Sequence, residues 1–86
     1  MKGRRLPDGD VDSFTVENGD YGRNADGGWR AKCPNGLAAN LDNHVVVLHE
    51  DGTISVSPSI LCSGFNFGPE RLQWHGYLEH GVWRAC

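Results

Sequence analysis

The dipeptide Asp51-Gly52 lies between two runs rich in β-branched residues, and it constrains the fold more than any other feature of the chain. An Asp-Gly pair in this setting is a strong hairpin signal, because a type I′ turn needs positive φ at both central residues. The sequence therefore predicts an antiparallel hairpin over residues 44–57. A two-residue turn places Val47 opposite Val56. The predicted core face of this hairpin consists of Val45, Val47, Ile54 and Val56.

A second hairpin is predicted over residues 72–86, with His80-Gly81 at its turn. A two-residue turn there places Leu78 opposite Trp83 and His75 opposite Cys86. Side chains alternate between the two faces of a sheet along each strand. One face of this hairpin is therefore predicted to carry Trp74, Leu78, Trp83 and Ala85, and the other His75, Tyr77, Arg84 and Cys86.

The rest of the chain is divided into short pieces by 12 glycines and four prolines, which favour strands and turns over long helices. Residues 29–33 alternate as a half-buried strand does, with Trp29, Ala31 and Cys33 facing inward. Residues 11–16 are a further strand candidate, and residues 37–43 are compatible with one helical turn.

The predicted fold class is mainly β: a small single domain of two antiparallel hairpins plus one or two short strands, with little helix. Residues 1–10 are predicted to be a disordered tail and residues 11–86 the domain. A chain of 86 residues leaves a thin core, because it buries only about 60% of its unfolded surface. A metal ion or a partner chain would therefore help to stabilise it.

The setting is predicted to be the cytoplasm. No run of residues approaches the ~18 apolar positions of a membrane span. The basic N-terminus is not followed by the apolar segment of a signal peptide. Three widely spaced cysteines, an odd number, argue against a secreted disulfide framework. In a reducing compartment we expect these thiols to be free or bound to a metal.

The charge of the chain is negative and uneven. A net charge of −3 is a poor footprint for direct nucleic-acid binding. Residues 6–28 hold six acidic residues, whereas Arg23 is the one basic residue there. One interpretation is a solvated, mobile segment. The other is a surface that imitates nucleic-acid phosphates and occupies a basic groove of another protein. The candidate partner-binding residues in this segment are Asp8, Asp10, Asp12, Asp20 and Asp26.

Catalytic motifs are absent from the sequence. It contains no Gly-x-Ser-x-Gly elbow, no phosphate-binding glycine-rich loop and no His-Glu-x-x-His helix. We interpret His49-Glu50-Asp51 as the solvated end of a hairpin rather than an acid–base group. Two hairpins also lack the deep pocket that catalysis favours. The chain is therefore predicted not to be an enzyme, and no catalytic residue is assigned.

A partial metal-binding pattern is present. Residues 33–36, Cys-Pro-Asn-Gly, are similar to half of a zinc knuckle, with Gly36 in the place of the second cysteine. Cross-strand neighbours such as His75 and Cys86 have Cβ atoms ~5 Å apart, which suits two ligands of one tetrahedral zinc ion. The candidate ligand set is Cys33, Cys62, His75 and Cys86. The favoured alternative is that the cysteines pack as small apolar residues and that no cofactor is bound.

The aromatic residues gather in the last third of the chain. Most of them must form the core of so small a domain. Any that stay exposed would form a protein-binding patch, because aromatic side chains dominate interface hot spots. The candidates in the second hairpin are Trp74, Tyr77 and Trp83.

Three segments resemble a known family. They are Cys33-Pro34, residues 51–60 (Asp-Gly-Thr-Ile-Ser-Val-Ser-Pro-Ser-Ile) and residues 74–83 (Trp-His-Gly-Tyr-Leu-Glu-His-Gly-Val-Trp). Together, over residues 29–86, they look like small phage and prophage proteins of unknown function that are sometimes mislabelled as ammonia monooxygenases. That family has a Cys-Pro-x-Cys pair, a Ser-Pro-Ser segment, a Cys-His pair and an Asp-Gly turn. Here Gly36 replaces the second cysteine, and Trp74 stands where the family has the cysteine before His75.

The resemblance implies a phage or prophage accessory protein and no particular reaction. We therefore expect a non-enzymatic protein that binds a host protein in the host cytoplasm. An inhibitor of a bacterial defence system such as CRISPR–Cas is one form of this expectation. It involves neither direct nucleic-acid binding nor a membrane. The alternative is a zinc-stabilised structural or adaptor module of the phage.

Overall fold

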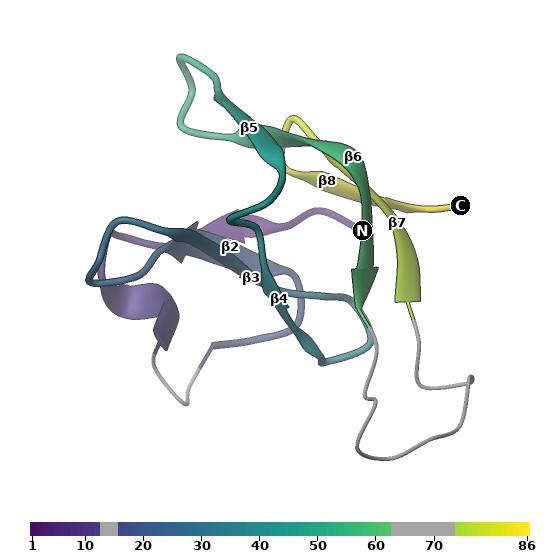
Figure 1. Cartoon of the computed structure of the whole chain (residues 1–86), viewed down its shortest axis with the longest axis horizontal. Helices are drawn as coiled ribbons and strands as arrows, with labels where there is room; N and C mark the ends of the chain where they lie inside the picture. The colour runs from purple at the N-terminus through teal and green to yellow at the C-terminus, as the bar shows by residue number, and fades with distance from the viewer. Residues whose placement is uncertain (13–15, 63–73) are drawn as a thin grey trace.

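The computed structural model describes residues 1–12, 16–62 and 74–86, and in these ranges it consists of two four-stranded sheets (Figure 1). The first sheet contains β1 (Arg4–Arg5), β2 (Asp20–Arg23), β3 (Trp29–Lys32) and β4 (Ala38–Asn40). The second contains β5 (Val45–Leu48), β6 (Ile54–Cys62), β7 (Trp74–Glu79) and β8 (Val82–Ala85). A three-residue 3-10 helix, η1 (Asp10–Asp12), precedes β2. The predicted mainly-β class is confirmed.

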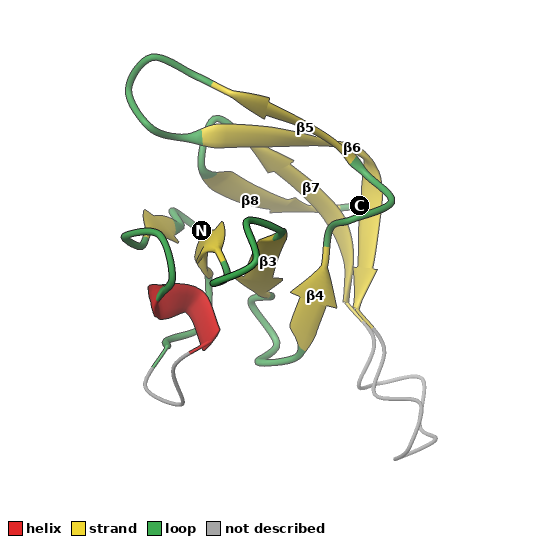
Figure 2. Cartoon of the chain, turned by 60° about the vertical axis from the view of Figure 1, so that its left-hand side comes forward, coloured by secondary structure: helices red, strands yellow, loops and turns green. Residues whose placement is uncertain are grey.

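The core lies between the two sheets (Figure 2). The first sheet and its flanking residues contribute Tyr21, Ala31, Cys33, Ala39 and Leu41. The second sheet contributes Ile54, Val56, Ile60, Leu78 and Trp83. All of these side chains are buried. Each large apolar side chain buried in this way stabilises the fold by about 1.5–3 kcal/mol.

The segment after β3 forms a strand where the sequence suggested a helical turn. Residues 34–36 reverse the chain, with the amide of Gly36 donating to the carbonyl of Cys33 at 2.8 Å. The strand β4 then pairs with β3, with Ala39 opposite Ala31. Burial alternates along this segment, so that Ala39 and Leu41 are buried while their neighbours are exposed. That two-residue period favours a strand over a helix.

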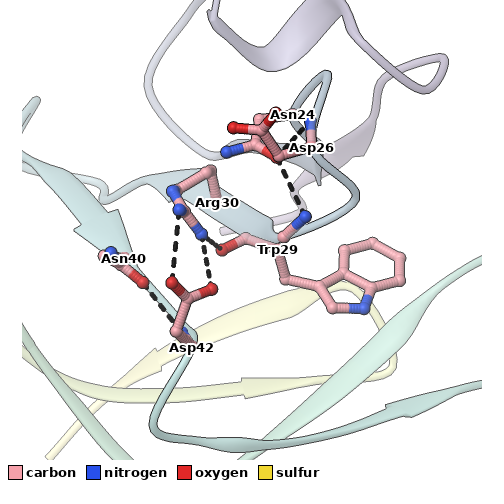
Figure 3. A network of polar contacts seen from close by, with 7 residues as sticks. Asn24, Asp26, Trp29, Arg30, Asn40 and Asp42 are labelled. Carbon is pink, nitrogen blue, oxygen red and sulfur yellow. Dashed lines mark hydrogen bonds and ion pairs between the residues drawn. The ribbon is translucent and has the colours of Figure 1, made fainter.

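A polar network ties the start of β3 to the segment that leaves β4 (Figure 3). The guanidinium of Arg30 binds both carboxylate oxygens of Asp42, at 2.8 and 3.3 Å. The same guanidinium donates to the carbonyl of Trp29 at 2.8 Å. The side chain of Asn24 accepts from the amides of Asp26 and Gly28 and so closes the turn between β2 and β3. The Arg30–Asp42 pair thus holds the start of β3 close to the segment that follows β4.

The hairpin over residues 44–57 is confirmed, but its register differs by one residue from the prediction. Leu48 lies opposite Ile54, and the amide of His49 donates to the carbonyl of Thr53. The turn therefore has three residues, ending at Gly52 with φ of 87°. Such a turn is a type I turn followed by a left-handed glycine, which adds one residue to the loop.

This register reverses the faces of β5. A slip of one residue moves every side chain of a strand to the opposite face. Val46 therefore packs against the core, and Val45 and Val47 are exposed. The predicted core face was right for Ile54 and Val56 and wrong for the two valines of β5.

The Gly52→Val variant is expected to lose about 1–2 kcal/mol of unfolding free energy, the cost of a left-handed conformation for a residue with a Cβ. A Cβ at this position would meet no atom within 4 Å, so the effect comes from the backbone alone. Urea denaturation measures it. The Gly52→Asn variant is the control, because asparagine tolerates positive φ, and it should lose less. An unchanged midpoint for Gly52→Val would contradict this turn.

The second hairpin has the predicted register. Leu78 lies opposite Trp83, and the amide of Cys86 donates to the carbonyl of His75 at 2.9 Å. Its two turn residues, His80 and Gly81, have φ of 46° and 75°, as a type I′ turn requires. The stacked imidazoles of His49 and His80, with ring centroids 3.7 Å apart, bring the tips of the two hairpins together.

The first residues are bonded into both sheets, in contrast to the predicted disordered tail. Met1 and Trp83 exchange backbone hydrogen bonds, and the amide of Gly3 donates to the carbonyl of Gly81 at 2.7 Å. The chain then enters β1, which runs parallel to β2. Residues 1–3 thus cover the edge of β8, whose backbone groups would otherwise lack partners. The predicted strand over residues 11–16 is replaced at its start by η1, and residues 13–15 lie outside the described ranges.

Candidate protein-binding face

The outer face of the second sheet, turned away from the core, carries large apolar side chains. Their exposed fractions are 39% or more. Leu61, Tyr77 and Val82 each lie beside a buried residue in their strands, and Val45 and Val47 flank Val46, which packs against the core. Alternation therefore turns these side chains away from the core. Tyr77, for example, lies between the buried residues Gly76 and Leu78. We define the outer face by Val45, Val47, Leu61, Tyr77 and Val82.

The strand β6 lies between β5, which carries Val45 and Val47, and β7, which carries Tyr77. Ser55 and Ser57 lie opposite Val47 and Val45. The pairing of β6 with β7 is irregular between Val56 and Ile60, where β6 has two more residues than its partner. Because two residues make one full period of a strand, Leu61 returns to the same face. Short serine side chains in the middle strand leave the flanking valines and Tyr77 as the larger contact groups.

Polar groups on the outer face bond mainly to one another. The hydroxyl of Ser59 lies 2.7 Å from Nε2 of His75. Arg84 and Glu79 form an exposed ion pair at 3.8 Å. A serine nucleophile needs a base that is itself oriented by a third group. Among the described residues no carboxylate hydrogen-bonds to His75, so the pair has no such third member there.

Three of the four candidate zinc ligands, Cys33, His75 and Cys86, have described side chains, and the structure does not gather them into one metal-binding cluster. His75 and Cys86 are cross-strand neighbours, as predicted, and both are exposed. In the backbone register Cys62 lies opposite Trp74. Cys33 is buried and disulfide-bonded, and with that bond intact it offers no thiolate to a metal. Within the described residues, no cluster of three or more ligating side chains is suited to a metal ion.

The state of Cys33 differs from the expected free or metal-bound thiol. The residue follows β3 and lies in the core between the two sheets, with none of its surface exposed. Tertiary packing decides which sulfur atoms meet, and the spacing of cysteines along the chain does not. Cys86, at the end of the second hairpin, is a free and exposed thiol.

The acidic candidates divide into paired and exposed groups. Asp20 is buried, and it accepts hydrogen bonds from the guanidinium of Arg4, at 2.7 and 3.1 Å, and from the amide of Glu17. Its hydrogen bond with Arg4 also raises the pKa of that guanidinium. Asp20 therefore has a structural role and is not available to a partner.

Asp8 remains exposed but binds Arg5 at 3.0 Å. Asp10 and Asp26 are exposed, and Asp12 ends η1. Arg4 and Arg5 thus offset part of the acidic segment. The sequence did not predict these two ion pairs, because Arg4 and Arg5 were assigned to a disordered tail.

The aromatic candidates also divide. Trp83 is 3% exposed, and its indole donates to the carbonyl of Gly19 at 2.9 Å. Trp74 is partly buried and meets the Trp83 ring edge to face, at 5.3 Å between centroids. Tyr77 alone of the three candidates belongs to the outer face. The apolar residues beside it were missed for two reasons. Val45 and Val47 were assigned to the core by the wrong register, and Leu61 and Val82 were not considered.

Comparisons with protein-family models, with curated proteins and with solved structures found no match. Within the described residues, no helix is long and apolar enough to cross a membrane.

Stability is expected to fall below about pH 4, in part through Asp42. Hydrogen bonds from Arg30 lower the pKa of this carboxyl, so its ionised form stabilises the folded chain above the unfolded pKa. That contribution is lost as the pH falls through the folded pKa. The Asp42→Asn variant should therefore lose less stability on acidification than the wild type does.

Urea midpoints at neutral and at acid pH measure the effect. The Asp26→Asn variant is the control, because the Asp26 carboxylate has no hydrogen bond or ion pair among the described residues. Equal acid sensitivity in the wild type and Asp42→Asn would show that the Arg30–Asp42 pair contributes nothing.

Proposed function

We propose that this chain is a non-enzymatic phage or prophage accessory protein that acts by binding a host protein through its outer face. The observation that supports the proposal is the exposure of Val45, Val47, Leu61, Tyr77 and Val82 on one side of one sheet. Apolar residues that gather on a surface in this way are typical of interaction sites. Tyrosine is also among the residues that dominate binding energy at interfaces.

The geometry favours this face over the acidic segment as the place of contact. In the acidic segment Asp20 is buried and Asp8 is paired with Arg5, so neither carboxylate is free to bind a partner. On the outer face, Glu79 and Arg84 offset each other, so that the apolar groups are the main means of attraction. Binding should therefore depend on contact area and only weakly on ionic strength.

The nature of the partner rests on the resemblance of residues 29–86 to small phage and prophage proteins. A protein of this kind works in the host cytoplasm, and a small domain that covers a surface on a host protein can inhibit it without chemistry. A component of a bacterial defence system such as CRISPR–Cas is the partner class that we propose. Neither direct nucleic-acid contact nor a membrane is needed for this mode of action.

The experiment is capture of host proteins from a bacterial lysate, followed by titration of the purified partner. The Tyr77→Ala variant should lose about 2 kcal/mol of binding free energy, which is roughly a thirtyfold loss of affinity. Val47→Ser, which replaces an exposed apolar side chain of the outer face with a short polar one, should weaken binding to a smaller extent. The control is Ala38→Ser, an exposed position of the first sheet. Equal affinity of Tyr77→Ala and the control would exclude the outer face.

Salt dependence separates the two candidate surfaces. If the acidic segment makes the contact, then Asp8→Lys and Asp10→Lys should slow association and weaken its dependence on salt. If the outer face does, these variants should bind as the wild type does. Phage challenge of cells with and without the gene tests the wider role. No change in phage survival or in any defence activity would exclude the inhibitor proposal.

A further inference from the structure

One arginine stands apart from the others in the described part of the chain. Four arginines each have a carboxylate partner: Arg4 with Asp20, Arg5 with Asp8, Arg30 with Asp42 and Arg84 with Glu79. Figure 3 shows the Arg30–Asp42 pair. Among the described residues Arg23 has no ion pair, and its buried Nε has no hydrogen-bond partner. A buried donor without an acceptor is destabilising, and a charged one more so.

The indole of Trp29 holds the Arg23 guanidinium in place. The two residues lie directly opposite each other on β2 and β3. The central carbon of the guanidinium is 4.7 Å from the centroid of a Trp29 ring, the distance of a cation–π contact. Trp29 itself packs against the core and is therefore a fixed platform. This contact orients the guanidinium but accepts none of its N–H groups.

A second cation lies beside the same indole. The guanidinium carbon of Arg5 is 4.8 Å from a Trp29 ring centroid. Its donors are already in use, because it binds the carbonyls of Leu6 and Gly52 and the carboxylate of Asp8. Of the two guanidiniums beside this indole, Arg5 has the carboxylate of Asp8 as its partner, and Arg23 has no carboxylate partner among the described residues. The unused donors belong to Arg23.

We infer that Arg23, held on Trp29, is an anion-binding site whose ligand is a carboxylate. A guanidinium binds a planar carboxylate through two parallel hydrogen bonds, and Arg30 binds Asp42 through both of its terminal nitrogens in this fold. A carboxylate is also the partner of each of the four other described arginines in this fold, so one carboxylate would give Arg23 the same kind of ion pair. The site lies on the first sheet, so it does not depend on the outer face.

The test is titration of the full chain with acetate, followed through the arginine Nε–H resonances by NMR. Sodium chloride at the same ionic strength corrects for salt. The Arg23 resonance should shift and saturate, and those of Arg30 and Arg84 should shift little. Arg23→Lys, in which binding is followed through the indole N–H resonance of Trp29, should bind acetate about tenfold or more weakly, because lysine lacks the guanidinium fork. The matched control Arg84→Lys should bind as the wild type does.

Two further ligands complete the test. Inorganic phosphate that binds more tightly than acetate would overturn the assignment to carboxylate. A blocked glutamate, acetylated and amidated, that binds at least as well as acetate supports the site and assigns it to a side chain of another protein. Weaker binding of the blocked glutamate than of acetate supports the site and assigns it to a small free carboxylate. The inference fails if acetate causes no saturable shift of the wild-type Arg23 resonance, or if Arg23→Lys binds acetate as the wild type does.

Discussion

The Gly76→Ala variant is expected to lose about 3 kcal/mol or more of unfolding free energy, at the upper end of what overpacking costs. A Cβ at this position would collide with the backbone carbonyl oxygen of Arg84. It would also lie 2.6 Å from the indole of Trp74 and 2.9 Å from the Cα of Ala85. Two of these three atoms belong to the backbone of β8, so relief requires the strands to separate.

Urea denaturation monitored by circular dichroism measures this loss. The control is Gly27→Ala, where φ is 87° but a Cβ would meet no atom within 4 Å. That variant should lose only the cost of the backbone conformation, about 1–2 kcal/mol. Equal losses in the two variants would show that β7 and β8 are not packed as closely as the structure describes.

The Trp83→Ala variant is expected to lose about 3–5 kcal/mol, the usual cost of truncating a buried aromatic residue. The ring is 3% exposed and packs edge to face against Trp74. Its indole also bonds to the carbonyl of Gly19, and so joins the second sheet to the chain that enters β2. A domain of this length has a total stability of only about 4–13 kcal/mol, so the variant loses a large share of it.

Two related variants separate the contribution of the hydrogen bond to Gly19 from that of the burial of the ring. Trp83→Phe retains an aromatic ring but leaves the Gly19 carbonyl without its donor, and it should lose about 1–3 kcal/mol. Tyr77→Ala, on the outer face of the same hairpin, should lose much less than Trp83→Ala. If the two alanine variants were equally unstable, Trp83 would not be part of the core.

The variants also link stability to the proposed function. Along β7 the side chains of Trp74 and Leu78 face the core, Gly76 is buried between them, and Tyr77 lies on the outer face. A binding defect from Tyr77→Ala can therefore be attributed to the surface when the melting temperature is retained. Gly76→Ala and Trp83→Ala would disturb the same face through the fold, so they do not serve as probes of binding.

The sequence by itself determined those features that depend on residues close together in the chain. The His80-Gly81 turn required positive φ at both positions, and its two-residue length set every pair between β7 and β8. Alternation along β3 likewise predicted the inward position of Ala31. These features follow from turn chemistry and strand period, which act over a few residues.

Only the tertiary structure decided the features that depend on distant partners. At Asp51-Gly52 the structure has a three-residue turn in place of the predicted two-residue turn, and in this register Val46 packs against the core. Residues 1–10 were predicted to be a disordered tail, because the strand edges that bind residues 1–5, on β8 and β2, come much later in the chain. The same separation conceals the burial of Asp20 and the guanidinium of Arg23, which has no ion pair among the described residues. Local sequence carries no information about which distant backbone or charge will be the neighbour, because closure of the fold creates those contacts.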